Sequence, residues 1–74
     1  MNIKNKFGKR VKELRLQKGC SQEQFSHECH LDRTYIASIE NGKRNVSIEN
    51  IEKITIALKI SLSDFFSSEQ FSGN

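Results

Sequence analysis

The sequence predicts an all-α fold, and three observations point to it. Apolar residues recur at three- and four-residue spacing, which is the period of a helix that is buried on one side. No segment alternates apolar and polar residues in the way a half-buried β-strand does. Gly19 and Gly42 follow two of the periodic stretches, where glycine commonly ends a helix. A chain of 74 residues is long enough for one small domain.

The first helix is expected over about residues 3–18, because one stripe of it is apolar and Gly19 follows as a left-handed stop. The stripe consists of Ile3, Phe7, Val11 and Leu14. Gly8 lies inside this helix and weakens it by about 1 kcal/mol relative to alanine. A glycine retained at that cost predicts a close contact with another helix.

Two short helices are expected next. The second begins after Ser21, whose hydroxyl pairs with Gln24 in a capping box, and it ends near residue 29 or 30. The third begins after Asp32, a favourable N-cap, and ends at Asn41 and Gly42.

Two further helices complete the expected bundle. The fourth begins after Ser47, and its inner stripe consists of Ile48, Ile51, Ile54, Thr55 and Leu58. A last short helix begins at Ser61 and carries Phe65 and Phe66. The sequence therefore predicts a compact five-helix bundle over residues 1–67, followed by a loose C-terminal tail over residues 68–74.

The positive charge is concentrated at the start of the chain. The net charge is +3, but the first twenty residues carry one acid, Glu13, against Lys4, Lys6, Lys9, Arg10, Lys12, Arg15 and Lys18. A second basic group follows at Lys43 and Arg44. A basic patch on a folded domain attracts polyanions such as nucleic acid. The alternative is that the lysine-rich first helix is simply solvated.

Composition and spacing argue against several classes of protein. No apolar run is long enough to span a membrane, and charges replace the apolar core of a signal peptide. Two cysteines without such a signal predict free thiols in the cytoplasm. The metal-capable residues Cys20, His27, Cys29 and His30 lack the spacing of a zinc site, and the adjacent Cys29 and His30 would point apart. We therefore expect no metal, no cofactor and no enzymatic activity, with a Cys20–Cys29 disulfide as a minor alternative.

The second and third helices are separated by about three residues, the connection of a helix–turn–helix. On a helical wheel the isoleucines of the third helix face inward, and Arg33, Thr34, Ala37 and Ser38 lie on the outer side. Arg33 could donate two hydrogen bonds to guanine, and Thr34 offers a hydroxyl and a methyl to thymine. Ser21, Gln22 and the free N–H groups of the second helix could contact a phosphate. The alternative is a surface ion pair for Arg33, with Thr34 and Ser38 simply facing solvent.

Arg15 and Glu40 flank the inward faces of the first and third helices. They could form a partly buried ion pair, or they could be two independent surface charges.

Three stretches carry a resemblance to a known family. Residues 19–25 (GCSQEQF), 31–36 (LDRTYI) and 39–43 (IENGK) resemble the Cro/phage-repressor (XRE) helix–turn–helix family, and the similarity extends over about residues 7–66. The stretch RTYI and the loop GKRN are most similar to controller proteins of restriction–modification systems. The resemblance implies a lambda-repressor-like DNA-binding domain whose third helix enters the major groove.

The resemblance also assigns roles to individual residues. It places base readout on Arg33, Thr34, Tyr35 and Ser38, with Gln22 at the edge of the groove. It places the DNA backbone, or for Arg44 the minor groove, against Ser21, Asn41, Lys43, Arg44 and Asn45. Arg15 and Glu40 occupy the positions of the family's internal ion pair. Three positions depart from the family pattern: His30 and Lys59 replace glycines, and Ser26 replaces a small alanine.

The apolar residues near the C-terminus exceed what one small core needs. Members of the family bind palindromic operators as homodimers, so the resemblance implies a dimer interface formed by Ile56, Ile60, Leu62, Phe65 and Phe66. These residues, with Phe71, could instead complete the core or bind a foreign protein.

These observations predict a transcriptional regulator that binds specific double-stranded DNA as a homodimer and takes no small-molecule ligand. The resemblance favours an autoregulatory controller of a restriction–modification operon, which also delays the endonuclease gene. A phage-type repressor, or an antitoxin or adaptor that binds protein through the same fold, is the alternative.

Overall fold

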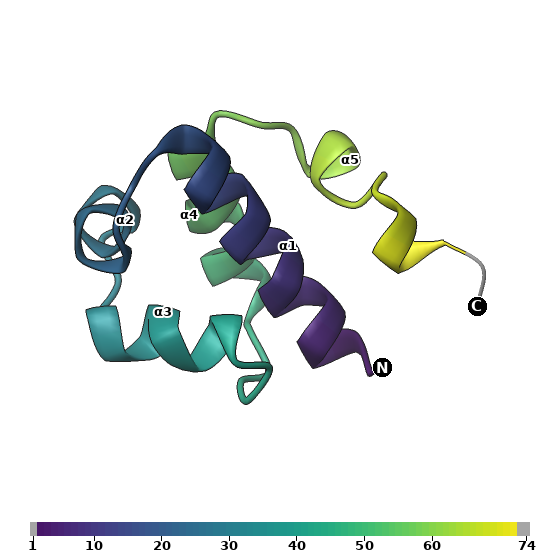
Figure 1. Cartoon of the computed structure of the whole chain (residues 1–74), viewed down its shortest axis with the longest axis horizontal. Helices are drawn as coiled ribbons and strands as arrows, with labels where there is room; N and C mark the ends of the chain where they lie inside the picture. Colours follow the sequence, from purple (N-terminus) through teal and green to yellow (C-terminus); the bar gives the residue numbers. More distant parts are fainter. Residues whose placement is uncertain (1, 73–74) are drawn as a thin grey trace.

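The computed structural model describes residues 2–72, which fold into helices joined by short connections (Figure 1). The elements are α1 (Ile3–Lys18), α2 (Gln22–Cys29), α3 (Arg33–Glu40), α4 (Ile48–Leu58), α5 (Leu62–Phe65) and a 3-10 helix, η1 (Glu69–Phe71). Residues 2–72 contain no strand. The expected all-α fold of five α-helices is therefore confirmed, and the helices begin close to the expected positions. α5 ends at Phe65, so Phe66, expected within it, lies just beyond its end.

α1 forms the axis around which the other helices pack. In Figure 1 it crosses the centre of the molecule, with α2 and α3 on one side, α4 behind it, and α5 and η1 on the other side. The molecule measures 33 × 23 × 22 Å along its principal axes. None of the helices in the described range is both long and apolar enough to cross a membrane.

Each α-helix begins where a side chain accepts a hydrogen bond from a backbone N–H of the first turn. Ser21 and Gln24 form the expected capping box, with bonds of 3.0 Å and 2.9 Å. The other capping residues are Asn2, Asp32, Ser47 and Ser61. These caps satisfy donors that a helix leaves free at its start, which is why the starts of the helices could be predicted from the sequence.

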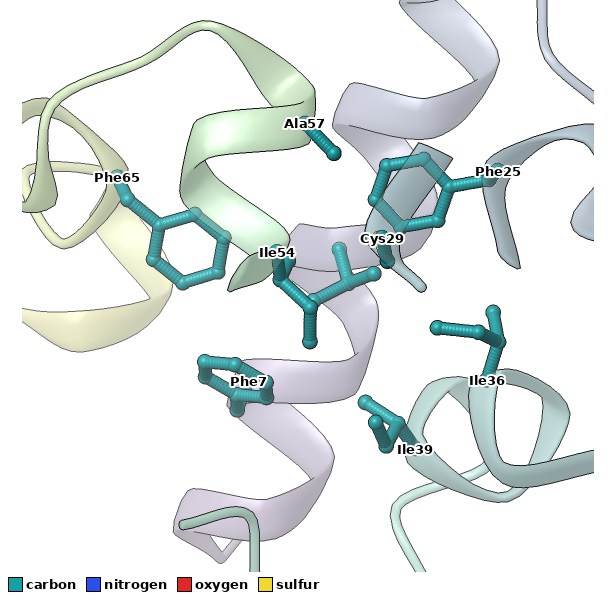
Figure 2. Packing of buried hydrophobic residues seen from close by; sticks show 9 residues of the cluster. Phe7, Phe25, Cys29, Ile36, Ile39, Ile54, Ala57 and Phe65 are labelled. Atoms are coloured by element: carbon teal, nitrogen blue, oxygen red, sulfur yellow. The ribbon is translucent and has the colours of Figure 1, made fainter. Parts of the chain in front are cut away.

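The core is formed by one side of every α-helix (Figure 2). Its buried members are Phe7, Val11, Phe25, Cys29, Ile36, Ile39, Ile54, Ala57 and Phe65. Two residues of the expected stripes are exposed: Ile3 is 63 % exposed and Ile48 is 78 % exposed. Both are the first residue of their helix, and because helical side chains lean toward the N-terminus, they project beyond the packed region.

Gly8 brings α1 directly against the end of α3. A Cβ atom at this position would collide with the carbonyl oxygen of Ile39 and would also crowd the backbone of Glu40. The close helix contact expected from the sequence is therefore present. Because backbone meets backbone there, α3 has little freedom to slide along α1.

His30 ends α2 in the left-handed conformation, with φ 58° and ψ 38°, and Lys59 does the same after α4. Left-handed backbone costs a residue with a Cβ atom roughly 1–2 kcal/mol. Glycine avoids this cost, but it loses more conformational entropy on folding, which offsets part of the gain.

We expect His30→Gly to raise the free energy of unfolding by about 1 kcal/mol, measured by urea denaturation. His30→Ala removes the same exposed side chain but keeps the Cβ atom, so it should give no such gain; an equal gain would show that the backbone is not the cause.

The segment expected to be a loose tail is packed over residues 69–71, which form η1. The Phe71 ring lies 5.0 Å from Phe66 and 6.1 Å from Phe65, measured between centroids. Gln70 donates a hydrogen bond of 3.1 Å to the Glu13 carboxylate on α1. The expectation missed this because a single aromatic residue after a serine pair gives no periodic signal. Residues 73 and 74 of that expected tail lie outside the described residues.

Candidate nucleic-acid interface

α2, the turn and α3 form the expected helix–turn–helix. Figure 1 shows α2 end-on and α3 lengthwise, so the two helices cross steeply. The left-handed His30 reverses the chain, and the N–H of Leu31 donates to the Ser26 carbonyl at 3.0 Å. The buried Ser26 hydroxyl donates to the Glu23 carbonyl at 2.7 Å, which supplies the backbone acceptor that a hydroxyl at this position requires.

The outer face of α3 is polar, and its charged residue forms no ion pair with any residue from 2 to 72. Arg33 and Thr34 are exposed, Ala37 and Ser38 are half-buried, and Ile36 and Ile39 face the core. Within residues 2–72 no ion pair involves Arg33. The described part of the chain therefore does not form the surface ion pair considered for Arg33, and its guanidinium has five N–H donors that can bind a ligand.

Arg15 and Glu40 form the expected internal ion pair. The Arg15 guanidinium donates to the Glu40 carboxylate through Nε at 2.7 Å and Nη2 at 3.0 Å, and through Nη1 to the Cys20 carbonyl at 2.7 Å. Only 7 % and 2 % of the two side chains are exposed. The hydrogen bond to Glu40 raises the pKa of Arg15, against the opposing effect of burial. This pair joins the end of α3 to α1.

Gln22 belongs to the same cluster, which the sequence did not indicate. Its side-chain Nε2 donates to the Glu40 carboxylate at 3.1 Å, and the residue is half-buried. The structure thus directs the amide nitrogen of Gln22 inward, whereas we expected the side chain at the edge of the groove.

Tyr35 is held by contacts with the loop after α3 and with α4. It is half-buried against the core, its hydroxyl accepts a hydrogen bond of 3.1 Å from Nδ2 of Asn50, and the Arg44 guanidinium lies 5.2 Å from its ring centroid. Asn50 is a functional candidate that sequence reasoning missed, because it stands in the first turn of α4 and no local pattern pairs it with α3.

The remaining expected DNA contacts are at the surface. The loop after α3 exposes Asn41, Lys43, Arg44 and Asn45, and Ser21 is exposed at the start of α2. The described residues offer neither Lys43 nor Arg44 an acidic partner within ion-pair distance. The loop therefore presents two uncompensated positive charges directly after α3.

The cysteines form no disulfide. Cys29 is buried, and burial raises the pKa of its thiol to about 12, so it is an unreactive core thiol. Cys20 is half-buried and also free. No cluster of three or more His, Cys, Asp or Glu side chains within residues 2–72 is arranged to hold a metal ion.

The C-terminal apolar residues divide into two groups. Ile56, Leu62 and Phe66 are 69 %, 45 % and 38 % exposed, and Ile60 is half-buried. Phe65, expected at a dimer interface, is instead completely buried, because α5 turns its ring into the core, 5.1 Å from that of Phe7.

The Arg10 guanidinium lies over the Phe65 ring, 5.8 Å from its centroid, and its Nε donates to the Phe65 carbonyl at 2.8 Å. Phe66 remains outside and borders an apolar groove of about 220 Å³, which is lined also by Ile3, Phe7, Val46 and Ile51.

The family described as helix-turn-helix matches residues 11–65, which include α2, the turn and α3. The chain belongs to this helix–turn–helix family. Its relatives within the family confirm the resemblance to restriction–modification controllers.

Two of these relatives are control proteins. C.MunI of Mycoplasma sp is 55 % identical over 67 residues, covering 89 % of this chain and 90 % of its own. C.BamHI of Bacillus amyloliquefaciens is 52 % identical over 64 residues, covering 85 % and 79 %. Among solved structures, the controller C.Esp1396I, a tetramer in complex with its natural 35-base-pair operator, matches with a TM-score of 0.83 and 38 % identity, covering 89 % of this chain and 87 % of its own.

Proposed function

We propose that this helix–turn–helix protein is a transcriptional regulator that binds a specific double-stranded DNA operator and controls a restriction–modification operon, its own promoter included. The observation that carries the proposal is the outer face of α3, where Arg33 is exposed and has no acidic partner in the described chain. The identity with C.MunI and C.BamHI supports the controller role. We place the regulator in the cytoplasm, where such an operon is transcribed.

In this proposal one set of residues contacts the bases and another contacts the DNA backbone. Arg33, Thr34 and Ser38 contact base edges, since the N-terminal part of the second helix of such a motif reaches the major groove. The DNA backbone is contacted by Ser21, Asn41, Lys43, Arg44 and Asn45. Phosphate contacts supply affinity and base contacts supply sequence discrimination.

The active species in this proposal is a homodimer. Ile56, Leu62 and Phe66 expose apolar area on one chain, and a second copy would remove that area from water. Two copies of α3 would then enter successive major grooves about 34–36 Å apart, which requires a palindromic operator.

Sedimentation of the purified protein should show a dimer whose fraction rises with protein concentration. A strict monomer would instead favour the adaptor or antitoxin alternative.

Selection from random DNA duplexes tests the proposal directly. Repeated binding and amplification should enrich a palindrome whose half-sites are one helical turn apart. The enriched duplex should bind at least about a thousandfold more tightly than bulk competitor at the same salt concentration. If no duplex binds more tightly than bulk competitor, the proposed function is wrong.

A further inference from the structure

A small cluster beside α3 consists of Tyr35, Arg44 and Asn50. Of these three residues, the proposed DNA contacts include only Arg44. The three residues come from α3, the loop after it and the first turn of α4. The Tyr35 ring lies beneath the Arg44 guanidinium, and the Tyr35 hydroxyl is bound to Asn50 on the side of α4. We infer that Asn50 is a positioning residue for DNA binding, which fixes Tyr35 so that its ring holds Arg44 in place beside α3.

The position of Asn50 is itself well defined. Its backbone N–H donates to the Ser47 hydroxyl at 3.2 Å as part of the cap of α4. Both Asn50 and Tyr35 are half-buried, so the hydrogen bond between their side chains is partly shielded from water. A donor fixed on one helix thus determines where the ring of a residue on another helix lies.

Arg44 has no ion pair to hold it within the described residues. It is exposed, stands in a loop, and has no acidic partner among residues 2–72. A free arginine side chain loses much conformational freedom when it binds a phosphate. An aromatic ring attracts a guanidinium held over its face, so Arg44 is partly ordered before DNA arrives.

This assignment differs from direct base reading by Tyr35. The Tyr35 hydroxyl accepts from Asn50 and keeps its own proton to donate, but the role assigned here belongs to the ring, which faces the Arg44 guanidinium. The inference rests on the proposed DNA binding, but its first step, the ordering of Arg44 by Tyr35 and Asn50, is testable without DNA.

The DNA-free test uses the ring current of Tyr35, the only tyrosine in a chain without tryptophan. The side-chain protons of Arg44 should be shifted upfield in the proton NMR spectrum of the wild-type protein. This shift should diminish in Asn50→Ala and vanish in Tyr35→Leu. Ser63→Ala, which removes an exposed hydroxyl on α5, serves as the control and should retain it. Arg44 protons at unshifted positions in the wild type would overturn the inference.

The DNA test is a double-mutant cycle, in which the affinity of each variant for the duplex enriched by selection is measured. All variants must be folded, and all are measured at the same salt concentration. Asn50→Ala should weaken binding about three- to tenfold, the usual range for losing one hydrogen bond. Tyr35→Phe keeps the ring but removes the same bond, so it should weaken binding similarly, and the two changes together should cost no more than either alone.

The background of Arg44→Ala decides between positioning and direct contact. If Asn50 acts through Arg44, Asn50→Ala should change affinity less than about twofold once Arg44 is absent. An equal loss in both backgrounds, or no loss in either, would overturn the inference. Failure of the wild type to prefer any duplex would instead refute the proposed function, and the NMR result would still decide whether Asn50 orders Arg44.

Discussion

Replacing Glu40 with alanine is expected to lower the free energy of unfolding by about 3–5 kcal/mol. The substitution leaves the Arg15 guanidinium, whose side chain is 7 % exposed, without its counter-charge. It also removes the acceptor of the Gln22 amide. A domain of this length is stable by roughly 4–11 kcal/mol, so the loss should be evident as a large fall in the urea midpoint of unfolding.

The matched control is Glu28→Ala, at an ion pair of comparable length on the surface. Lys18 Nζ and Glu28 Oε1 are 3.0 Å apart, but the side chains are 26 % and 42 % exposed. Such pairs contribute about 0–1 kcal/mol, so this variant should unfold almost as the wild type does. Equal destabilisation by the two variants would show that burial does not set the importance of the Arg15–Glu40 pair.

Replacing Arg33 with alanine is expected to cost about 1–3 kcal/mol of operator binding while leaving non-specific binding nearly unchanged. The reason is that Arg33 stands at the start of α3, exposed and without an acidic partner in the described residues. In that position it can donate two hydrogen bonds to a guanine edge. Titrations with the selected duplex and with a random duplex, in the same buffer, give the two affinities.

Lys43→Ala is the matched variant for a phosphate contact. It should weaken binding to both duplexes and lower the slope of log K against log salt by about one unit. Arg33→Ala should instead act mainly on the selected duplex. A similar loss on both duplexes after Arg33→Ala would contradict the assignment of base reading to this arginine.

Most of the fold could be predicted because its signals are local. Ser21, Asp32, Ser47 and Ser61 each cap the helix that follows within three residues along the chain. The periodic stripes likewise predicted that Ile36 and Ile39 face the core. Local signals failed at the ends of the stripes: Ile48 fits the period of α4 but lies beyond the region where α4 has a neighbour to pack against.

The sequence could predict which residues of the site face outward, but not the contacts that they make with other helices. The outward direction of Arg33 and Thr34 follows from the period of α3 alone. The bonds of Gln22 to Glu40 and of Asn50 to Tyr35 join residues 18 and 15 positions apart, and they form only when the helices are packed. Phe65 was misplaced for the same reason, since neighbouring phenylalanines give no indication of which one α5 turns inward.

Because of the glycine contact between α1 and α3, the position of α3 does not depend on the side chains of its outer face. Gly8 and the backbone of Ile39 set where α3 lies, and neither contributes a side chain to the outer face. Substitutions at Arg33, Thr34 and Ser38 could therefore retarget the protein to a new operator sequence while the scaffold beneath them remains unaltered. Relatives of this chain could diverge in the sites they recognise without first having to evolve a new fold.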